Sequence, residues 1–104
     1  MELRERLEQA TGFEWDDGNL EKSRLAHDVT AAESEQIFFN EPLVLADDRR
    51  HSGEENRFYA LGRTGGGRVL LVVFTMRGSL IRVISARDAS RRERAAYEAA
   101  EESA

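Results

Sequence analysis

The fold of this chain is decided by residues 57–87, which read RFYALGRTGGGRVLLVVFTMRGSLIRVISAR. This stretch holds three runs rich in β-branched and aromatic residues, at about 57–63, 68–75 and 80–87. The two links between the runs are short and contain glycine, which is typical of consecutive antiparallel hairpins. The middle run is apolar at nearly every position, so it predicts a central strand covered by helices on at least one side.

The same stretch concentrates positive charge. It contains no acidic residue and six arginines, which are Arg57, Arg63, Arg68, Arg77, Arg82 and Arg87. The first 55 residues have the opposite balance, with 15 acidic and 6 basic side chains. Guanidinium groups are planar, permanently charged forks that suit phosphate oxygens. Two interpretations are open at this point: the arginine block binds phosphates, or it pairs with the acidic half of the chain.

The segments before this block predict short helices and strands. The expected elements are a charged helix at 2–10, a strand at 13–15, a helix from Asp16 or Asp17 to about His27, and a short strand at 43–46. Between the helix that ends near His27 and the strand at 43–46, Thr30 and Glu33 have the spacing of a capping box, which predicts the start of another helix. That helix carries Ile37, Phe38 and Phe39 near its end and stops before Pro42. A polar loop is expected at 47–56.

A second capping box, Ser90 with Glu93, predicts a final helix to about residue 100. The order of elements predicts an α+β fold in which N-terminal helices pack on a mainly antiparallel sheet and a C-terminal helix closes it. We expect residues 1–104 to form a single domain. The helix at 2–10 has Leu3, Leu7 and Ala10 on one face, so it either docks through them or remains a mobile accessory segment.

Composition excludes several classes of protein. With 104 residues, 40% hydrophobic and 34% charged, the chain suits one globular domain and not a disordered segment. No apolar run approaches the roughly 20 residues of a membrane helix, and the first residues are too acidic for a signal peptide. The absence of cysteine excludes disulfides and cysteine nucleophiles. We therefore expect a cytoplasmic protein with no membrane partner.

Two strand ends carry candidate functional arginines. Alternation along 80–87 predicts that Arg87 shares a face with Ile81 and Val83 and that its head reaches a cleft at the end of the strand. Arg63 ends an earlier strand in the same way, and Gly62 before it allows another backbone or a ligand to approach closely. The alternative for both arginines is a solvated position at the rim, paired to an acid.

Histidine and glycine patterns complete the search for chemistry. His27 falls near the end of a predicted helix, where the helix dipole favours a protonated imidazole. It is either a general acid or an ordinary contact at a helix terminus. His51 lies among acidic residues, but Arg49 and Arg50 interrupt them, so we expect no metal site. The run at 65–67 lacks the Lys-Ser/Thr pair of a phosphate-binding loop, and we expect no cofactor.

Several segments, taken together and in order from about residue 13 to 98, resemble the BrnT toxin family. They are FEWD at 13–16, AHDV at 26–29, IFF at 37–39, YALGR at 59–63, VVFT at 72–75, IRVISAR at 81–87 and RRER at 91–94. The resemblance implies a RelE-like or barnase-like fold and the activity of an endoribonuclease toxin of a type II toxin–antitoxin pair. It also implies a hetero-oligomer with a BrnA-like antitoxin, through which alone DNA is contacted.

The resemblance also implies roles for individual residues in metal-independent cleavage of RNA. Arg63 and Arg87 occupy the positions expected to bind phosphate and stabilise the transition state, and His27 is the candidate acid or base. The residues expected to contact the RNA substrate are Arg57, Arg77, Arg82 and Glu55. Such cleavage needs a base for the 2′-hydroxyl, an acid for the leaving oxygen and cations for the phosphorane charge.

The first long helix departs from the family pattern. Relatives usually have Lys-His-Gly where this chain has Ala26-His27-Asp28, and an Asn where it has Ser23. Loss of a cation beside the histidine would weaken a phosphate site by about 1–3 kcal/mol. Either another residue compensates, or the chain is an attenuated or inactive toxin.

Three functional hypotheses follow. The chain is an active ribonuclease toxin, a catalytically inactive toxin fold that binds its antitoxin as a regulatory module, or an unrelated small binding domain with structural arginines. Under each of them we expect the exposed edge of the sheet and its cationic face to form the interaction surface.

Overall fold

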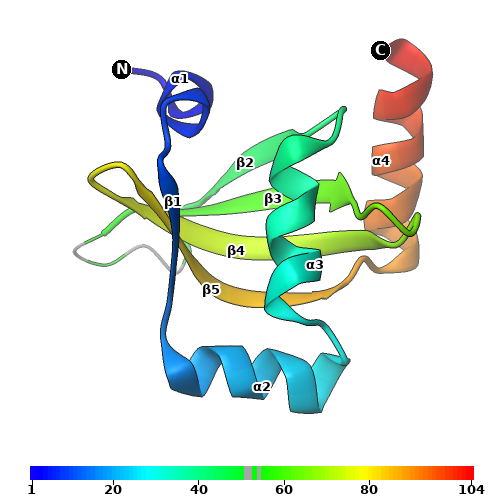
Figure 1. Cartoon of the computed structure of the whole chain (residues 1–104). Coiled ribbons are helices and arrows are strands. Elements are labelled where there is room, and N and C mark those ends of the chain that lie inside the picture. Colours follow the sequence, from blue (N-terminus) through cyan, green and yellow to red (C-terminus); the bar gives the residue numbers. More distant parts are fainter. Residues whose placement is uncertain (51–52, 54) are drawn as a thin grey trace.

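The computed structural model describes residues 1–50, 53 and 55–104, so the metal interpretation of His51 lies outside the described residues. A five-stranded sheet has the order β1-β5-β4-β3-β2. Figure 1 shows α3 lying across one face of the sheet, α2 running along the β5 edge, and α4 at the far end of the strands. The elements are α1 (Leu3–Glu8), β1 (Gly12–Trp15), α2 (Asp17–His27), α3 (Ala31–Gln36), the 3₁₀ helix η1 (Ile37–Phe39), β2 (Val44–Asp48), β3 (Arg57–Arg63), β4 (Val69–Arg77), β5 (Leu80–Asp88) and α4 (Arg91–Ser103).

The predicted α+β fold and its antiparallel meander are confirmed. Strands β2 to β5 pair antiparallel in chain order. Strand β1 adds to the outer edge of β5 in parallel, with Gly12 opposite Leu80 and Trp15 opposite Val83. Strand β2 continues to Asp48, two residues into the predicted loop, because it keeps its pairing with β3 as far as Arg57.

The helix starts follow the predicted caps. Asp16 accepts a hydrogen bond from the backbone of Asn19 and begins α2. Both capping boxes are formed, at Thr30 for α3 and at Ser90 for α4. The end of α3 differs from the prediction, because the chain tightens into a 3₁₀ turn at Ile37–Phe39. This turn brings the backbone of Ile37 against β3.

The sheet has two different faces. One face packs against α3 and η1 and forms the main core, with Ile37, Leu70, Phe74 and Val83 almost wholly buried. The opposite face has a smaller apolar cluster under α4, formed by Leu61, Val69, Leu71 and Tyr97. The central strand β4 therefore contributes to both clusters, as its apolar sequence predicts.

The N-terminal helix α1 docks on the body of the protein. Leu3, Leu7 and Ala10 pack against the main core, and Arg4 donates a hydrogen bond to the carbonyl of Leu43 at 2.8 Å. None of the described helices is long and apolar enough to cross a membrane.

A bulge in β5 overturns the predicted facing of Arg87. Val73 pairs with Ser85 and Phe74 with Val83, so Ile84 is an extra residue in β5. Beyond the bulge the alternation is reversed, and Ala86 joins Val83 in the main core. The prediction that Arg87 shares a face with Ile81 and Val83 is therefore wrong, and Arg87 projects from the opposite face of the sheet.

Gly62 is required by the close approach of η1 to β3. A Cβ atom at this position would lie 2.7 Å from Cβ of Ile37. We expect Gly62→Ala to lower the free energy of unfolding by about 1–3 kcal/mol, because the packed turn must shift. Urea denaturation measures the change. Gly66→Ala is the matched control, since its Cβ would meet nothing closer than 3.9 Å, and equal stability of the two variants would contradict the role of this contact.

Candidate functional site

Five arginines of the block project from the sheet face opposite α3 and η1, which we call the arginine face. In β3, Arg57 and Arg63 alternate with the core positions Phe58 and Ala60. The same alternation applies in β4 and β5, where the members are Arg77, Arg82 and Arg87. At one end α4 covers this face through Tyr97. No helix in the described part of the chain covers the other end.

A hollow of about 380 Å³ opens at the uncovered end of the arginine face, and we call it the polar hollow. It brings together all four residues predicted to contact substrate, Glu55, Arg57, Arg77 and Arg82. The rest of its lining is Asn19, Gly53, Thr75 and Ile84. Segments distant in sequence therefore build one concave, strongly polar surface.

Carboxylates hold two arginines of the polar hollow, Arg77 and Arg82, in place. Arg77 donates to Glu55 with an Nη2–Oε1 distance of 2.9 Å. Arg82 lies between two acids, with 3.1 Å to Glu14 and 3.6 Å to Asp16. The hydrogen bond from Arg77 lowers the pKa of Glu55 and raises that of Arg77, so both groups are charged at neutral pH.

Sequence reasoning missed Glu14 and Asp16 as members of this site. Both flank Trp15 at the end of β1, and Glu14 is opposite Arg82 because β1 pairs with β5 in parallel. That pairing joins residues nearly 70 positions apart, and no local pattern predicts its register. The alternation of Phe13, Glu14 and Trp15 was the available signal that Glu14 faces away from the core.

Arg87 lies farther along the same face, beside α4. Its Nη1 and Nη2 donate to the two carboxylate oxygens of Glu93 at 2.8 and 3.0 Å. A second hollow of about 350 Å³ is lined by this ion pair together with Tyr59 and Leu71. Burial and the neighbouring Asp48 raise the pKa of Tyr59, so its hydroxyl stays protonated at neutral pH.

The Arg87–Glu93 pair predicts a pH dependence of stability. The hydrogen bonds from Arg87, followed by the cap at Ser90, lower the pKa of Glu93 from 4.5 to about 2. Because the folded-state pKa is depressed, Glu93 stabilises the fold fully above about pH 4.5, and this contribution is lost as the pH falls toward 2. Urea denaturation between pH 7 and pH 3 should show a weaker dependence for Glu93→Gln than for the parent or for the exposed control Glu102→Gln. Parallel curves for all three proteins would contradict this assignment.

Arg63 lies under α4 and not at either hollow. Its Nε and Nη2 bond both carboxylate oxygens of Glu101, at 3.0 and 2.7 Å, and its Nη1 donates to the carbonyl of Gly67. The guanidinium also stacks 5.7 Å from the centre of the Tyr97 ring. These contacts fasten α4 to the sheet.

Arg68 lies on the side of the sheet that carries the helix α3. It bonds both oxygens of Asp88 and reaches Glu33 of α3. It also donates to the backbone carbonyls of His27 and Asp28, where α2 ends. Arg68 thereby connects β4, β5, α2 and α3, and it is the member of the block with the most bonds of this kind among the described contacts.

The structure does not bring His27 to the polar hollow. His27 is the last residue of α2 and is exposed, and its imidazole forms no hydrogen bond with the described residues. Its charge contributes to lowering the pKa of Asp88, after larger effects of Arg68 and Arg94. His27 therefore lies near the end of β5. Asn19, near the start of the same helix, lines the polar hollow, so α2 borders the arginine face.

The other unusual positions of α2 have structural explanations. Ser23 is buried. Its Oγ accepts a hydrogen bond from the backbone N–H of Ala86, which lies in the part of β5 that β1 no longer pairs with. A larger Asn at this position has little room. Asp28 has the left-handed conformation, with φ of 51°, at the helix C-cap, which is why glycine suits this position. Ala26 is exposed and leaves room for a longer side chain.

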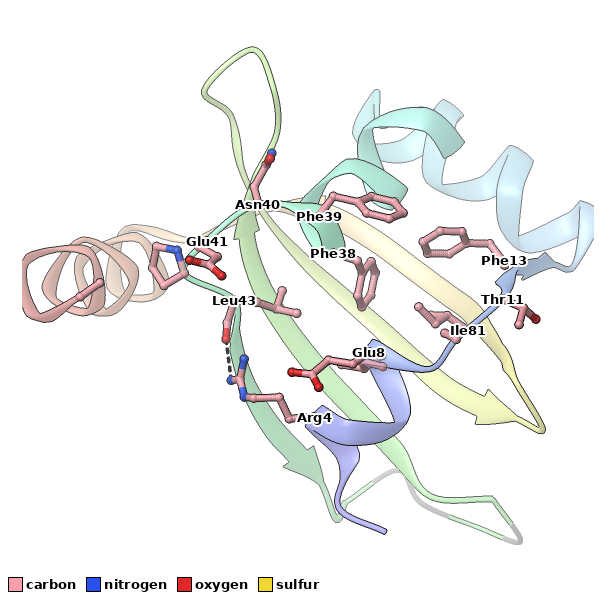
Figure 2. Close-up of a pocket in the computed structure, with 15 residues that line it drawn as sticks. Arg4, Glu8, Thr11, Phe13, Phe38, Phe39, Asn40, Glu41, Leu43 and Ile81 are labelled. Carbon is pink, nitrogen blue, oxygen red and sulfur yellow. Dashed lines mark hydrogen bonds between the residues drawn. The ribbon is translucent and has the colours of Figure 1, made fainter.

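A larger hollow, of about 640 Å³, lies on the other side of the molecule between α1 and η1. Figure 2 shows the rings of Phe13, Phe38 and Phe39 gathered beside Ile81, with Arg4 turned toward Leu43. The hollow is mainly apolar and lacks a cluster of cations, so we place the candidate site at the smaller polar hollow. Among the described residues, no group of three or more His, Cys, Asp or Glu is arranged to hold a metal ion.

Comparison with known proteins agrees with the family resemblance. Residues 15–93 match the sequence model of a family described as the ribonuclease toxin BrnT of type II toxin–antitoxin systems. The fold is similar to the crystal structure of the Brucella abortus ribonuclease toxin BrnT, with a TM-score of 0.59 and 23% identity over 77% of this chain and 97% of that one. No curated protein is a significant match.

Proposed function

Because the chain belongs to the BrnT family of ribonuclease toxins of type II toxin–antitoxin systems, we propose that it cleaves RNA at the polar hollow of its arginine face. The observation that carries this proposal is the convergence of Arg57, Arg77 and Arg82 in one open hollow. Three guanidiniums around one concave surface suit an RNA phosphate, whose charge increases in the transition state.

The proposed reaction is attack of the 2′-hydroxyl on the adjacent phosphorus atom. Glu55 is charged and lies in the hollow, so it is the group we assign to accept the 2′-hydroxyl proton. The new O2′–P bond forms as the P–O5′ bond breaks, and the leaving O5′ takes up a proton. Since the arginines supply the positive charge that stabilises the phosphorane, we propose that cleavage proceeds without a metal ion or other cofactor.

The remaining predicted residues flank the hollow. Arg87 is assigned to a neighbouring phosphate of the same strand, because it lies on the same face beside a second hollow. Arg63 contributes by holding α4, through Glu101, over the arginine face. His27 is the predicted acid or base, but it lies at the other end of α2 from Asn19, so we propose that water protonates the leaving O5′ and that His27 contacts the RNA outside the hollow.

Family membership implies an antitoxin partner. We propose that this partner is BrnA-like, that it forms a hetero-oligomer with the toxin, and that DNA is contacted only through the antitoxin. The proposed setting is the cytoplasm, where cleavage of cellular RNA arrests growth. The RelE-like classification of the fold is part of the same proposal.

The chemistry is tested with a pair of RNA oligonucleotides. We expect the protein to cleave an all-ribose strand and to leave intact the same strand carrying a 2′-deoxy sugar at the cleaved position. Equal cleavage of both strands would rule out attack by the 2′-hydroxyl. The toxin role is tested by induced expression, which should arrest growth with the parent gene and not with Arg82→Gln.

A second candidate function is favoured by the departures in α2. Ala26 stands where relatives have a lysine, and each of Arg77, Arg82 and Arg87 already has a carboxylate partner. We propose as the alternative that the chain is an attenuated or inactive toxin fold that acts as an antitoxin-binding module.

Ala26→Lys separates the two functions. Position 26 is exposed, so the lysine can be accommodated without repacking. If the parent is attenuated, restoring the cation is expected to raise the cleavage rate by about 5- to 150-fold, equivalent to 1–3 kcal/mol. If the site is already complete, we expect less than about a twofold change. Initial rates on one RNA measure the difference, with Ala26→Gln as the uncharged control.

A further inference from the structure

Most charges of the final helix α4 are arranged against its own dipole. Its first turn contains Glu93, which suits the positive end of the dipole, but also Arg91, Arg92 and Arg94, which do not. Its last turn contains Glu101 and Glu102 and no basic residue. Both arrangements destabilise a helix, so the fold does not explain why three arginines occupy the first turn.

These three arginines also differ from the block in the sheet. Arg63, Arg77, Arg82 and Arg87 each contact a carboxylate. Arg91, Arg92 and Arg94 are exposed and form no hydrogen bond or ion pair within the described part of the chain, although the charge of Arg94 is near enough to Asp88 to contribute to lowering its pKa. The two first-turn N–H groups of the capping box are occupied by Ser90 and Glu93, so the side chains themselves form the exposed positive surface.

This surface adjoins the arginine face. Glu93 lies within the same helical turn and bonds Arg87, which lines the second hollow. From the polar hollow to Arg87 the path follows β5 from Arg82, five residues or roughly 16 Å. Arginine side chains are therefore spaced from the polar hollow, past Arg87, to the start of α4, and those in the sheet are paired with carboxylates.

We propose that Arg91, Arg92 and Arg94 form a docking surface for the sugar–phosphate backbone of RNA, outside the reacting centre. The proposal rests on the proposed function. It adds a contact that strengthens the binding only of RNA strands too long to fit within the polar hollow. At about 3.4 Å of rise per phosphate in a stacked strand, the path from Arg82 to Arg87 corresponds to four or five nucleotides. A strand that reaches α4 must be longer still.

Free guanidiniums favour an RNA partner over a protein partner at this surface. A protein interface needs a desolvated core of apolar side chains, whereas the exposed neighbours of these arginines on α4 are small or charged, such as Ala95, Ala96 and Glu98. A phosphate backbone needs only regularly placed cations.

The test measures binding separately from cleavage. Fluorescence anisotropy with a 20-nucleotide 2′-O-methyl RNA, which cannot be cleaved through its 2′-oxygen, gives the affinity over a range of salt concentrations. The variant Arg91→Gln/Arg92→Gln/Arg94→Gln is compared with Arg4→Gln/Arg6→Gln/Arg24→Gln, which removes the same charge from α1 and from the side of α2 that faces Thr30 and Ala31. We expect the slope of log affinity against log salt to become shallower by about 2 only in the first variant, at about 0.7 per lost phosphate contact.

Two further measurements exclude an effect of the substitutions on folding or on the reacting centre. The melting temperature of the first variant should rise, because unfavourable charges leave the helix start. Its KM should rise for a long RNA, while its kcat and its rate on a tetranucleotide stay within twofold of the parent.

Equal slopes for the two triple variants would overturn the proposal while leaving cleavage at the hollow intact. Unchanged RNA binding with weakened binding of the antitoxin would overturn it in favour of a protein partner. If the parent binds with the expected slope but cleaves no RNA, the proposed function fails and the docking surface stands.

Discussion

Replacement of Arg82 by glutamine is expected to slow RNA cleavage by about 10²- to 10³-fold, the effect of removing one preorganised donor from a developing negative charge. Arg82 is more sheltered than Arg77 in the polar hollow, with 18% of its side chain accessible against 45%. Glu14 and Asp16 fix its orientation before substrate arrives. Its planar guanidinium is therefore preorganised, so we expect replacement of Arg82 to slow cleavage more than replacement of any other side chain.

The loss should appear in catalysis and not in folding. Both ion pairs of Arg82 are partly exposed to solvent, so their removal is expected to change the free energy of unfolding by no more than about 1 kcal/mol. Arg82→Lys keeps the charge without the fork and should give an intermediate rate. Arg24→Gln on the exposed side of α2 removes the same charge and should cleave like the parent. Equal rates for Arg82→Gln and Arg24→Gln would show that the hollow is not the reacting site.

Tyr97→Ala is expected to lower the free energy of unfolding by about 3–5 kcal/mol, the largest stability effect we predict. Tyr97 is wholly buried and is the one described residue of α4 in the core. Its hydroxyl donates to the carbonyl of Pro42 at 2.7 Å, and its ring lies under Arg63. Removing the side chain takes away both the packing and the platform for the Arg63–Glu101 pair.

The conservative variant separates packing from hydrogen bonding. Tyr97→Phe keeps the ring and leaves the carbonyl of Pro42 without its donor, so we expect a loss of about 1–3 kcal/mol. Urea denaturation of both variants gives the comparison. Because Glu93 is on the same helix one turn earlier, Tyr97→Ala should also loosen Arg87. A loss below 1 kcal/mol for Tyr97→Ala would contradict the assignment of Tyr97 as the anchor of α4.

Local chemistry explains what could be predicted from the sequence. The caps at Asp16, Thr30 and Ser90 were predicted, because each depends on residues within three positions. The three main strands were predicted within two residues, because β-branched runs and glycine turns are local signals. Gly62 was expected to admit a close neighbour, and the structure supplies the backbone of Ile37.

What could not be predicted depends on long-range contacts. The prediction of the sheet face on which Arg87 lies was wrong. The bulge at Ile84 has no local sequence signal, and it reverses the face to which every later side chain of β5 points. The parallel pairing of β1 with β5, which brings Glu14 to Arg82, joins distant segments. The sequence predicted that the arginines could pair with acidic residues, but not which acids. The structure pairs carboxylates from both ends of the chain with Arg63, Arg68, Arg77, Arg82 and Arg87.

The central claim is that the arginine face cleaves RNA by itself, and it is tested most directly by incubating the purified protein with a structured RNA in EDTA. The account predicts that the parent cleaves the RNA, that Arg24→Gln cleaves it equally, and that Arg82→Gln leaves it intact over the same time. Intact RNA in every lane, from protein that is folded and still binds its antitoxin, would contradict the claim and assign the chain to the inactive toxin fold.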